Sequence, residues 1–156
     1  MKMIRNLVSV LLMACLFQAC TTIDLYEKTE SFKLHEWNGN IKPTFQFEVS
    51  DTNSLYNIFI VMRHTDAYGF NNIWLNISTQ APTDTIVTQQ LNLQLADNKL
   101  GWLGNGMDDI FEHRIKIAGP SKLKKGKYSF TLEHIMRQDP LKNILQAGIR
   151  VEKVNL

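Results

Sequence analysis

Cys20 follows a short apolar segment near the N-terminus, where a thiol can become a site of lipid attachment. The segment begins with the basic residues Lys2 and Arg5 and continues as an uncharged apolar run over residues 7–17. A basic start, a short apolar run and a small residue before the cleavage point are the parts of an export signal. The run is too short for a transmembrane helix, which needs about 20 apolar residues. Ala19-Cys20 supplies the small residue and the cysteine that a lipoprotein signal peptidase requires.

We therefore predict that residues 1–19 are a lipoprotein signal peptide and that the Cys20 sulfur takes a diacylglyceryl thioether. Each acyl CH₂ buried in a membrane contributes about 0.8 kcal/mol, and the two or three chains of a lipoprotein suffice for stable anchoring. Two alternatives stay open. The tetrapeptide ending at Cys15 also resembles a lipobox, although cleavage there would leave the apolar Leu16 and Phe17 in the mature protein. The other alternative is an ordinary secretory signal followed by a chance cysteine.

The mature chain is expected to carry no net charge. The whole sequence has 17 Lys and Arg against 15 Asp and Glu, and removal of Lys2 and Arg5 leaves 15 of each sign. A neutral domain has no electrostatic drive toward nucleic acid. Only two cysteines are present, one lost with the signal and one consumed by lipid, so zinc-finger, iron–sulfur and thiol-nucleophile chemistry are not expected.

The remaining candidates for chemistry are four histidines, at positions 35, 64, 113 and 134. None has the spacing of a zinc site, and no serine lies in a G-x-S-x-G elbow. His113 and His134 fall on inward faces of expected strands and are interpreted as hydrogen-bonded histidines at the edge of the core. We therefore expect no enzymatic activity, no metal and no cofactor.

Most of the chain alternates between short apolar segments and turn signals, which is typical of β-strands. Residues 45–49 alternate apolar and polar, residues 55–63 are apolar on both faces, and residues 128–134 place Tyr128, Phe130, Leu132 and His134 on one face. Seven or eight such strands predict an all-β, antiparallel β-sandwich, with jelly-roll and immunoglobulin-like topologies both possible. Asp139-Pro140 has the pattern of a helix cap followed by proline, which predicts one short helical turn near Pro140.

These patterns divide the chain into a signal peptide (1–19), a lipid-anchored tether with a possible edge strand (20–40) and a single β-sandwich domain (41–156). Several aromatic residues lie outside the alternating pattern. Trp37, Tyr68 and Trp102 fall in expected loops, while Trp74 lies on the face opposite Ile73. Exposed aromatic rings on a sandwich can stack on sugars, although each ring can equally cap one end of the core.

Several spaced segments resemble the GldH family of gliding-motility lipoproteins of Bacteroidetes-type bacteria over essentially the whole chain. The matching features are Cys20, Leu55-Tyr56-Asn57-Ile58, Leu95-Ala96-Asp97, Gly101-Trp102-Leu103-Gly104-Asn105-Gly106, the segment Met136-Arg137-Gln138-Asp139-Pro140-Leu141-Lys142-Asn143-Ile144, and Ala147-Gly148-Ile149-Arg150-Val151-Glu152-Lys153. The family often has Gly and Val where this chain has Asn143 and Ala147.

The resemblance implies a non-catalytic accessory or assembly component of the gliding machinery, which in this group is linked to type IX secretion. The alternative is a cell-surface lipoprotein that binds glycans. The expected partners are a membrane, through the N-terminal lipid, and envelope proteins. Only one acid, Asp24, lies within five residues of Cys20, so a periplasm-facing anchor is slightly preferred over the cell surface. The matched segments supply a candidate interaction surface, namely Trp102, Arg137, Asp139, Pro140 and Arg150.

Overall fold

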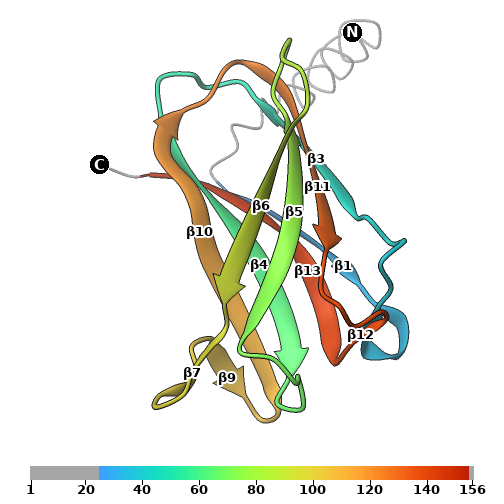
Figure 1. Cartoon of the computed structure of the whole chain (residues 1–156). Coiled ribbons are helices and arrows are strands. Elements are labelled where there is room, and N and C mark those ends of the chain that lie inside the picture. The colour runs from blue at the N-terminus through green and yellow to red at the C-terminus, as the bar shows by residue number, and fades with distance from the viewer. Residues whose placement is uncertain (1–24, 155–156) are drawn as a thin grey trace, which may run out of the picture.

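A computed structural model describes residues 25–154, which fold into two antiparallel sheets packed face to face (Figure 1). The signal peptide and Cys20 lie outside the described residues. The first sheet has the strand order β1 (Leu25–Ser31), β13 (Ile144–Lys153), β4 (Leu55–Thr65), β10 (Ile110–Lys122) and β9 (Asn105–Met107). The second has the order β3 (Thr44–Val49), β11 (Gly126–His134), β5 (Asn72–Gln80) and β6 (Val87–Gln94).

Four short strands and one 3₁₀ turn complete the described fold. The strands form two short pairs: β2 (Glu36–Trp37) with β12 (Leu141–Lys142), and β7 (Ala96–Asp97) with β8 (Gly101–Trp102). The 3₁₀ turn, η2, spans Lys33–His35. The expected all-β sandwich is therefore confirmed, and within residues 20–40 the structure places β1, η2 and β2.

The order of the long strands decides the topology. With β9 set aside, the eight long strands taken in chain order are arranged 1-8-3-6 in one sheet and 2-7-4-5 in the other. First and last strands are paired, then second and seventh, third and sixth, and fourth and fifth. This is the arrangement of a jelly roll, in which one long antiparallel ribbon is rolled into two sheets. It leaves β6 and β10 at neighbouring edges of the sandwich.

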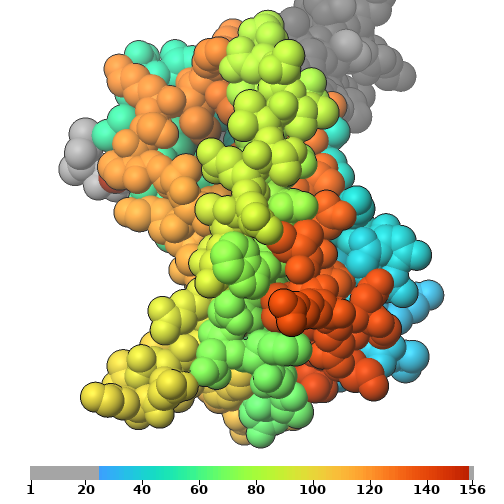
Figure 2. All heavy atoms as spheres, in the orientation of Figure 1, coloured from blue at the N-terminus to red at the C-terminus, as the bar shows by residue number. Residues whose placement is uncertain are grey.

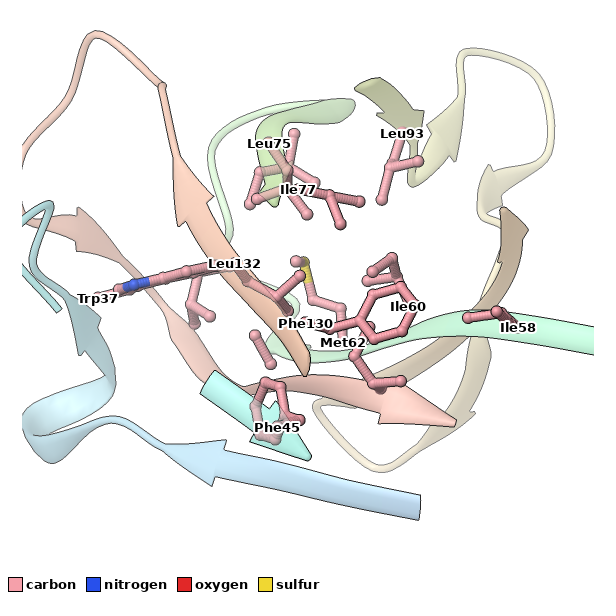
Figure 3. Close-up of a cluster of buried hydrophobic side chains, with 14 of the residues drawn as sticks. Trp37, Phe45, Ile58, Ile60, Met62, Leu75, Ile77, Leu93, Phe130 and Leu132 are labelled. Carbon is pink, nitrogen blue, oxygen red and sulfur yellow. The ribbon is translucent and has the colours of Figure 1, made fainter. Parts of the chain in front are cut away.

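The core lies between the sheets and is built from alternate residues of each strand, because successive side chains of a strand point to opposite faces. Figure 3 shows Leu75, Ile77 and Leu93 of the four-stranded sheet directed toward Ile58, Ile60 and Met62 of the other. The faces predicted by alternation in the sequence, at residues 45–49 and 128–134, are buried as expected.

The helical turn predicted near Pro140 is wrong. Residues 137–140 form a bend with a cis peptide between Asp139 and Pro140, and Leu141 then pairs with Trp37 in the β2–β12 ladder. The local pattern of a helix cap does not produce a helix here, because the backbone pairs instead with a segment that is distant in sequence. Leu141 and Trp37 are both fully buried, so the pairing also closes the core at this end.

Several lysines lie in and beside the connection between β10 and β11, which crosses from one sheet to the other because these two strands belong to different sheets. Lys124 there forms an ion pair with Asp84, with 2.8 Å between Nζ and Oδ2.

Candidate interaction surface

Asp139 is an exposed carboxylate that joins two distant segments. Its Oδ1 accepts a 2.8 Å hydrogen bond from the backbone N–H of Gly39, and the same oxygen lies 3.9 Å from Nε2 of His134. The Trp37 ring lies edge-on to His134 and donates its own N–H to the carbonyl of Ile41. Asp139 therefore does not cap a helix, as the sequence predicted, but accepts a hydrogen bond from the turn around Gly39.

Residues 135–137 border a groove that the sequence did not predict. Its lining residues are Phe70, Asn72, Trp74, Gln90, Ile135, Met136 and Arg137, which enclose about 450 Å³. Trp74 is 40% exposed, a high value for so large an apolar ring. The backbone N–H of Trp74 donates to the Met136 sulfur at 3.3 Å, and the backbone carbonyl of Trp74 accepts the Ile135 N–H at 3.0 Å. This end of the β5–β6 face therefore combines a flat ring, a thioether and the exposed Arg137.

Trp102 does not lie on that groove. It is half-buried on β8 against the ring of His64, with 4.3 Å between the ring centroids, and it also contacts Tyr68 and Phe111. The neighbouring Gly104 has no room for a side chain, because a Cβ would lie 2.8 Å from Nε2 of His113. The absence of a side chain at Gly104 therefore allows the loop that carries Trp102 to pack against a pair of histidines.

That pair, His64 and His113, is buried between β4 and β10, with 2.9 Å between the two Nε2 atoms. Nδ1 of His64 lies 2.7 Å from the Thr65 carbonyl, which can only accept, so this nitrogen carries the hydrogen. Nε2 of His64 is then the acceptor, and Nε2–H of His113 donates to it. Burial lowers the pKa of both rings, for His113 to about 4 with a further contribution from His64. Both rings are therefore neutral near pH 7.

Arg150 lies on the outer face of the five-stranded sheet. Its guanidinium binds Glu27 on β1 at 2.7 Å and Glu152 on β13 at 2.9 Å. Hydrogen bonding to Glu27 is the largest of the effects that raise the pKa of Arg150. Arg150 is thus held by carboxylates on two neighbouring strands, whereas Asp139 binds Gly39. The structure therefore divides the candidate surface: Arg137, Asp139 and Pro140 lie near one end, while Trp102 and Arg150 serve other contacts.

Two features of this region, the groove beside Trp74 and the His64–His113 pair, were not predicted from the sequence. The alternation of residues 73–77 already placed Trp74 outward, so an exposed tryptophan facing an uncharged strand was a detectable signal. The His64–His113 pair had no such signal, because the two histidines are 49 residues apart and meet only through β4–β10 register.

Most histidines of the described chain are packed within the fold. Three of the four histidines are buried among aromatic and aliphatic side chains. Within residues 25–154, no group of three His, Cys, Asp or Glu side chains is close enough to hold a metal ion. No helix in the same residues is long and apolar enough to cross a membrane.

Comparison with known proteins decides the family. The model of the GldH lipoprotein family matches residues 24–151. The chain belongs to the GldH lipoprotein family. Among its relatives, the gliding motility lipoprotein GldH of Flavobacterium johnsoniae is 27% identical over 157 residues, covering 96% of this chain and 98% of the relative. A homologue of GldH from Christiangramia forsetii is 26% identical over 146 residues, covering 88% of this chain and 89% of the relative.

Similarity to solved structures is weaker. Dimeric latent PorU from Porphyromonas gingivalis overlaps 88% of this chain and 13% of its own, with a TM-score of 0.40 and 12% identity. The VP2 subviral particle of infectious bursal disease virus overlaps 84% of this chain and 33% of its own, with a TM-score of 0.35 and 14% identity. Likeness at this level supports no inference about function.

Proposed function

We propose that this protein is a non-catalytic, membrane-anchored lipoprotein that acts as an accessory or assembly component of the gliding-motility and type IX secretion machinery of the cell envelope. The observation that carries the proposal is the family match over residues 24–151, together with a relative named as a gliding motility lipoprotein that aligns along 96% of this chain. Cys20 is the proposed lipid site, and a periplasm-facing orientation is preferred because Asp24 is the one acid close to it.

The site geometry supports a role in binding other proteins. Trp74, Met136 and Arg137 combine an exposed ring, a polarizable thioether and a guanidinium around one groove. Aromatic, Met and Arg side chains are enriched in the cores of protein interfaces. The buried histidines, by contrast, are packed as structural groups. The groove is therefore the proposed contact site for an envelope partner.

Substitution of Asp139 tests whether residues 137–140 serve in docking a partner or in stabilising the fold. Its bond to Gly39 ties residues 137–140 to the β2 segment, which supports a structural role in closing the core. We expect Asp139→Ala to lower stability and to leave partner recovery unchanged once folding is allowed for. Unchanged stability with loss of the partners would assign Asp139 to docking instead.

Affinity purification from the native envelope tests the proposal. The lipidated protein, with an affinity tag at its C-terminus, should recover components of the motility or secretion machinery. Arg137→Glu should reduce that recovery, because the substitution reverses the charge at the groove. Lys142→Glu is the matched control, because Lys142 is also exposed but does not line the groove. Recovery of no envelope protein, or equal recovery with both variants, would contradict this assignment of the groove.

Glycan binding is the second candidate, and one observation favours it. Strands β5 and β6 contain no charged residue, and around Trp74 their outward face carries amide side chains, including Asn76, Gln90 and Asn92. Within residues 25–154, however, Trp74 is the one aromatic ring with high exposure, rather than part of a flat strip of rings. Retarded migration of the protein in polysaccharide-containing gels, abolished by Trp74→Ala, would support this candidate over the first.

A further inference from the structure

Strand β6 forms an open edge of the four-stranded sheet. It pairs with β5 over eight residues in unbroken register, from Thr79–Val87 to Asn72–Gln94. No other strand of the described chain pairs with its second side. The sequence of β6, from Val87 to Gln94, contains no charged residue, no proline and no glycine. Its outer backbone N–H and C=O groups are therefore available to another strand.

The other sheet edges carry features that oppose strand addition. Charged side chains, proline, bulges and short length are the usual ways in which proteins protect an edge. Strand β1 has three charged residues, β9 has only three residues in all, and β3 is preceded by Lys42-Pro43. The free part of β10 contains Pro120 and two bulges. Strand β6 alone among the described edges has none of these features.

A cavity with mixed polar and apolar lining lies beside the β6 edge, between the two sheets. It has a volume of about 280 Å³, and its apolar lining includes Ile58, Ile77, Val87, Leu91, Ile117 and Phe130. Strands β6 and β10 border the cavity and are both on the viewed face in Figure 2. Val87, the first residue of β6, and the preceding Ile86 are 56% and 63% exposed. Apolar side chains are thus exposed to solvent beside the cavity.

We propose that β6 accepts an extended segment of a partner protein, which adds a strand to the sheet and places alternate apolar side chains in the cavity. Strand addition of this kind gains affinity from main-chain hydrogen bonds and specificity from pockets for alternate side chains. The cavity is smaller than roughly 300–1,000 Å³, the size typical of small-molecule sites, and it suits a row of a few aliphatic groups. A bound acyl chain would fill the cavity but leave the polar edge of β6 unpaired.

The charges around the cavity identify the kind of segment. Lys122 is the last residue of β10, and Lys125 lies on the connection that includes Lys124. Lys124 is already paired with Asp84 at the cavity. Lys122 and Lys125 are not within ion-pair distance of any carboxylate in the described chain. The segment should therefore carry carboxylates between its apolar residues. A second copy of this chain fits less well, because its own β6 has no acid.

This inference rests on the proposed function, because it describes how one envelope partner would bind. Binding at β6 can be tested without that partner. The probe is a fluorescent synthetic peptide of about nine residues, the length of a typical strand, in which valine alternates with glutamate. Added to the full lipidated protein in detergent, it should raise fluorescence anisotropy in a saturable way. A peptide with lysine in place of glutamate should bind at least about tenfold more weakly, and about 1 M salt should reduce the difference because it screens charge.

Backbone pairing has its own test. Two versions of the peptide carry N-methyl groups, one at odd positions and one at even positions. In a strand, N–H groups of successive residues point to opposite edges, so only one version loses the donors directed at β6. Strand addition predicts that one version fails to bind and the other binds nearly unchanged. Equal binding of both versions would overturn the proposal.

Variants of the protein locate the site. Val87→Glu should weaken binding by at least about tenfold, because it places a carboxylate at the cavity and repels the carboxylates of the peptide. Thr88→Glu is the matched control, since Thr88 is an exposed residue of β6 that lines neither the cavity nor the groove beside Trp74. Lys122→Glu combined with Lys125→Glu should reverse the preference between the two peptides, and Lys142→Glu should not. Because these residues are exposed, the variants should retain their folded circular dichroism spectrum.

Three further results would overturn the inference. They are the absence of saturable binding by either peptide, equal effects of Val87→Glu and Thr88→Glu, and concentration-dependent dimerisation that Val87→Glu abolishes. The last would identify a second copy as the occupant. None of these results bears on whether the protein serves gliding or secretion, so the proposed function would stand or fall on its own experiment.

Discussion

Acid should destabilise this protein at a pH where its carboxylates still hold their charges, because three histidines are buried in neutral form. Burial lowers the pKa of His64, His113 and His134, and for His113 the value falls to about 4. In the unfolded chain the same ring titrates near about 6.5. Between these two values the unfolded state binds more protons than the folded state. The free energy of unfolding is therefore constant above this window and falls as the pH falls through it.

The magnitude follows from the geometry of the histidine pair. One N–H lies between the Nε2 atoms of His64 and His113, which are 2.9 Å apart, so a second proton would bring two donors face to face. Each buried histidine contributes a slope of up to about 1.4 kcal/mol per pH unit within its window. For His113, which is only 3% exposed, the full effect is on the order of 3 kcal/mol. That is a large fraction of the stability of an ordinary domain.

Acidic groups contribute in a separate range. Hydrogen bonds from Ser54 and Lys153 hold the pKa of Asp51 well below its usual value, and Lys42 lowers the pKa of Glu133. Stability from such groups is present above their unfolded pKa, near about 4, and is lost only as the pH falls below it. The decrease between about pH 6.5 and pH 4.5 therefore belongs to the histidines.

Urea unfolding of the unlipidated chain, followed by tryptophan fluorescence at about pH 7.5 and about pH 4.5, measures the effect. His113→Gln should remove much of the difference, because the amide can still donate to His64 but does not titrate. His35→Gln is the matched control, since His35 is exposed on η2. Equal stability of the unchanged protein at both pH values, or an unchanged pH dependence in His113→Gln, would refute the argument.

Three further predictions concern single residues. Asp139→Ala should cost about 1 kcal/mol in urea unfolding, because the Gly39 N–H loses its acceptor, whereas Asp139→Asn keeps an acceptor and should cost less; equal costs would contradict this. Gly148→Ala should destabilise by roughly 1–3 kcal/mol or prevent folding, because a Cβ would lie 2.1 Å from a β1 carbonyl oxygen, and a stable variant with native circular dichroism would be inconsistent with the β1–β13 pairing. Cys20→Ser should abolish acyl labelling and release the protein from the membrane fraction; if Cys15→Ser alone does so, the lipid site is Cys15.

The sequence predicted the class of fold because that information is local. Alternation at Phe45, Phe47 and Val49 requires only that one face of a strand be buried, and the structure buries all three side chains. The jelly-roll order was not predictable, because it depends on pairs such as β1 with β13, whose residues lie at opposite ends of the domain. Turn signals mark where strands end but not which strands pair.

The same distinction explains the candidate site. Asp139-Pro140 has the local pattern of a helix start, yet the carboxylate binds Gly39, which is 100 residues away. The segments that resemble the family include both Arg137 and Arg150, but Arg137 lies in the bend before β12 and Arg150 lies on β13, at a different part of the surface. Alternation correctly placed Trp74 on the outward face, but the sequence did not show that Met136 and Arg137 lie beside it.

The central claim, that this lipoprotein serves the gliding and type IX secretion machinery, is tested most directly by deleting its gene in the source bacterium. Colony spreading and the proteins released into the medium are then measured, with a strain carrying the restored gene as the control. The deletion should impair spreading or retain secreted proteins in the cell, and the restored gene should reverse the defect. Normal spreading together with an unchanged set of released proteins would contradict it.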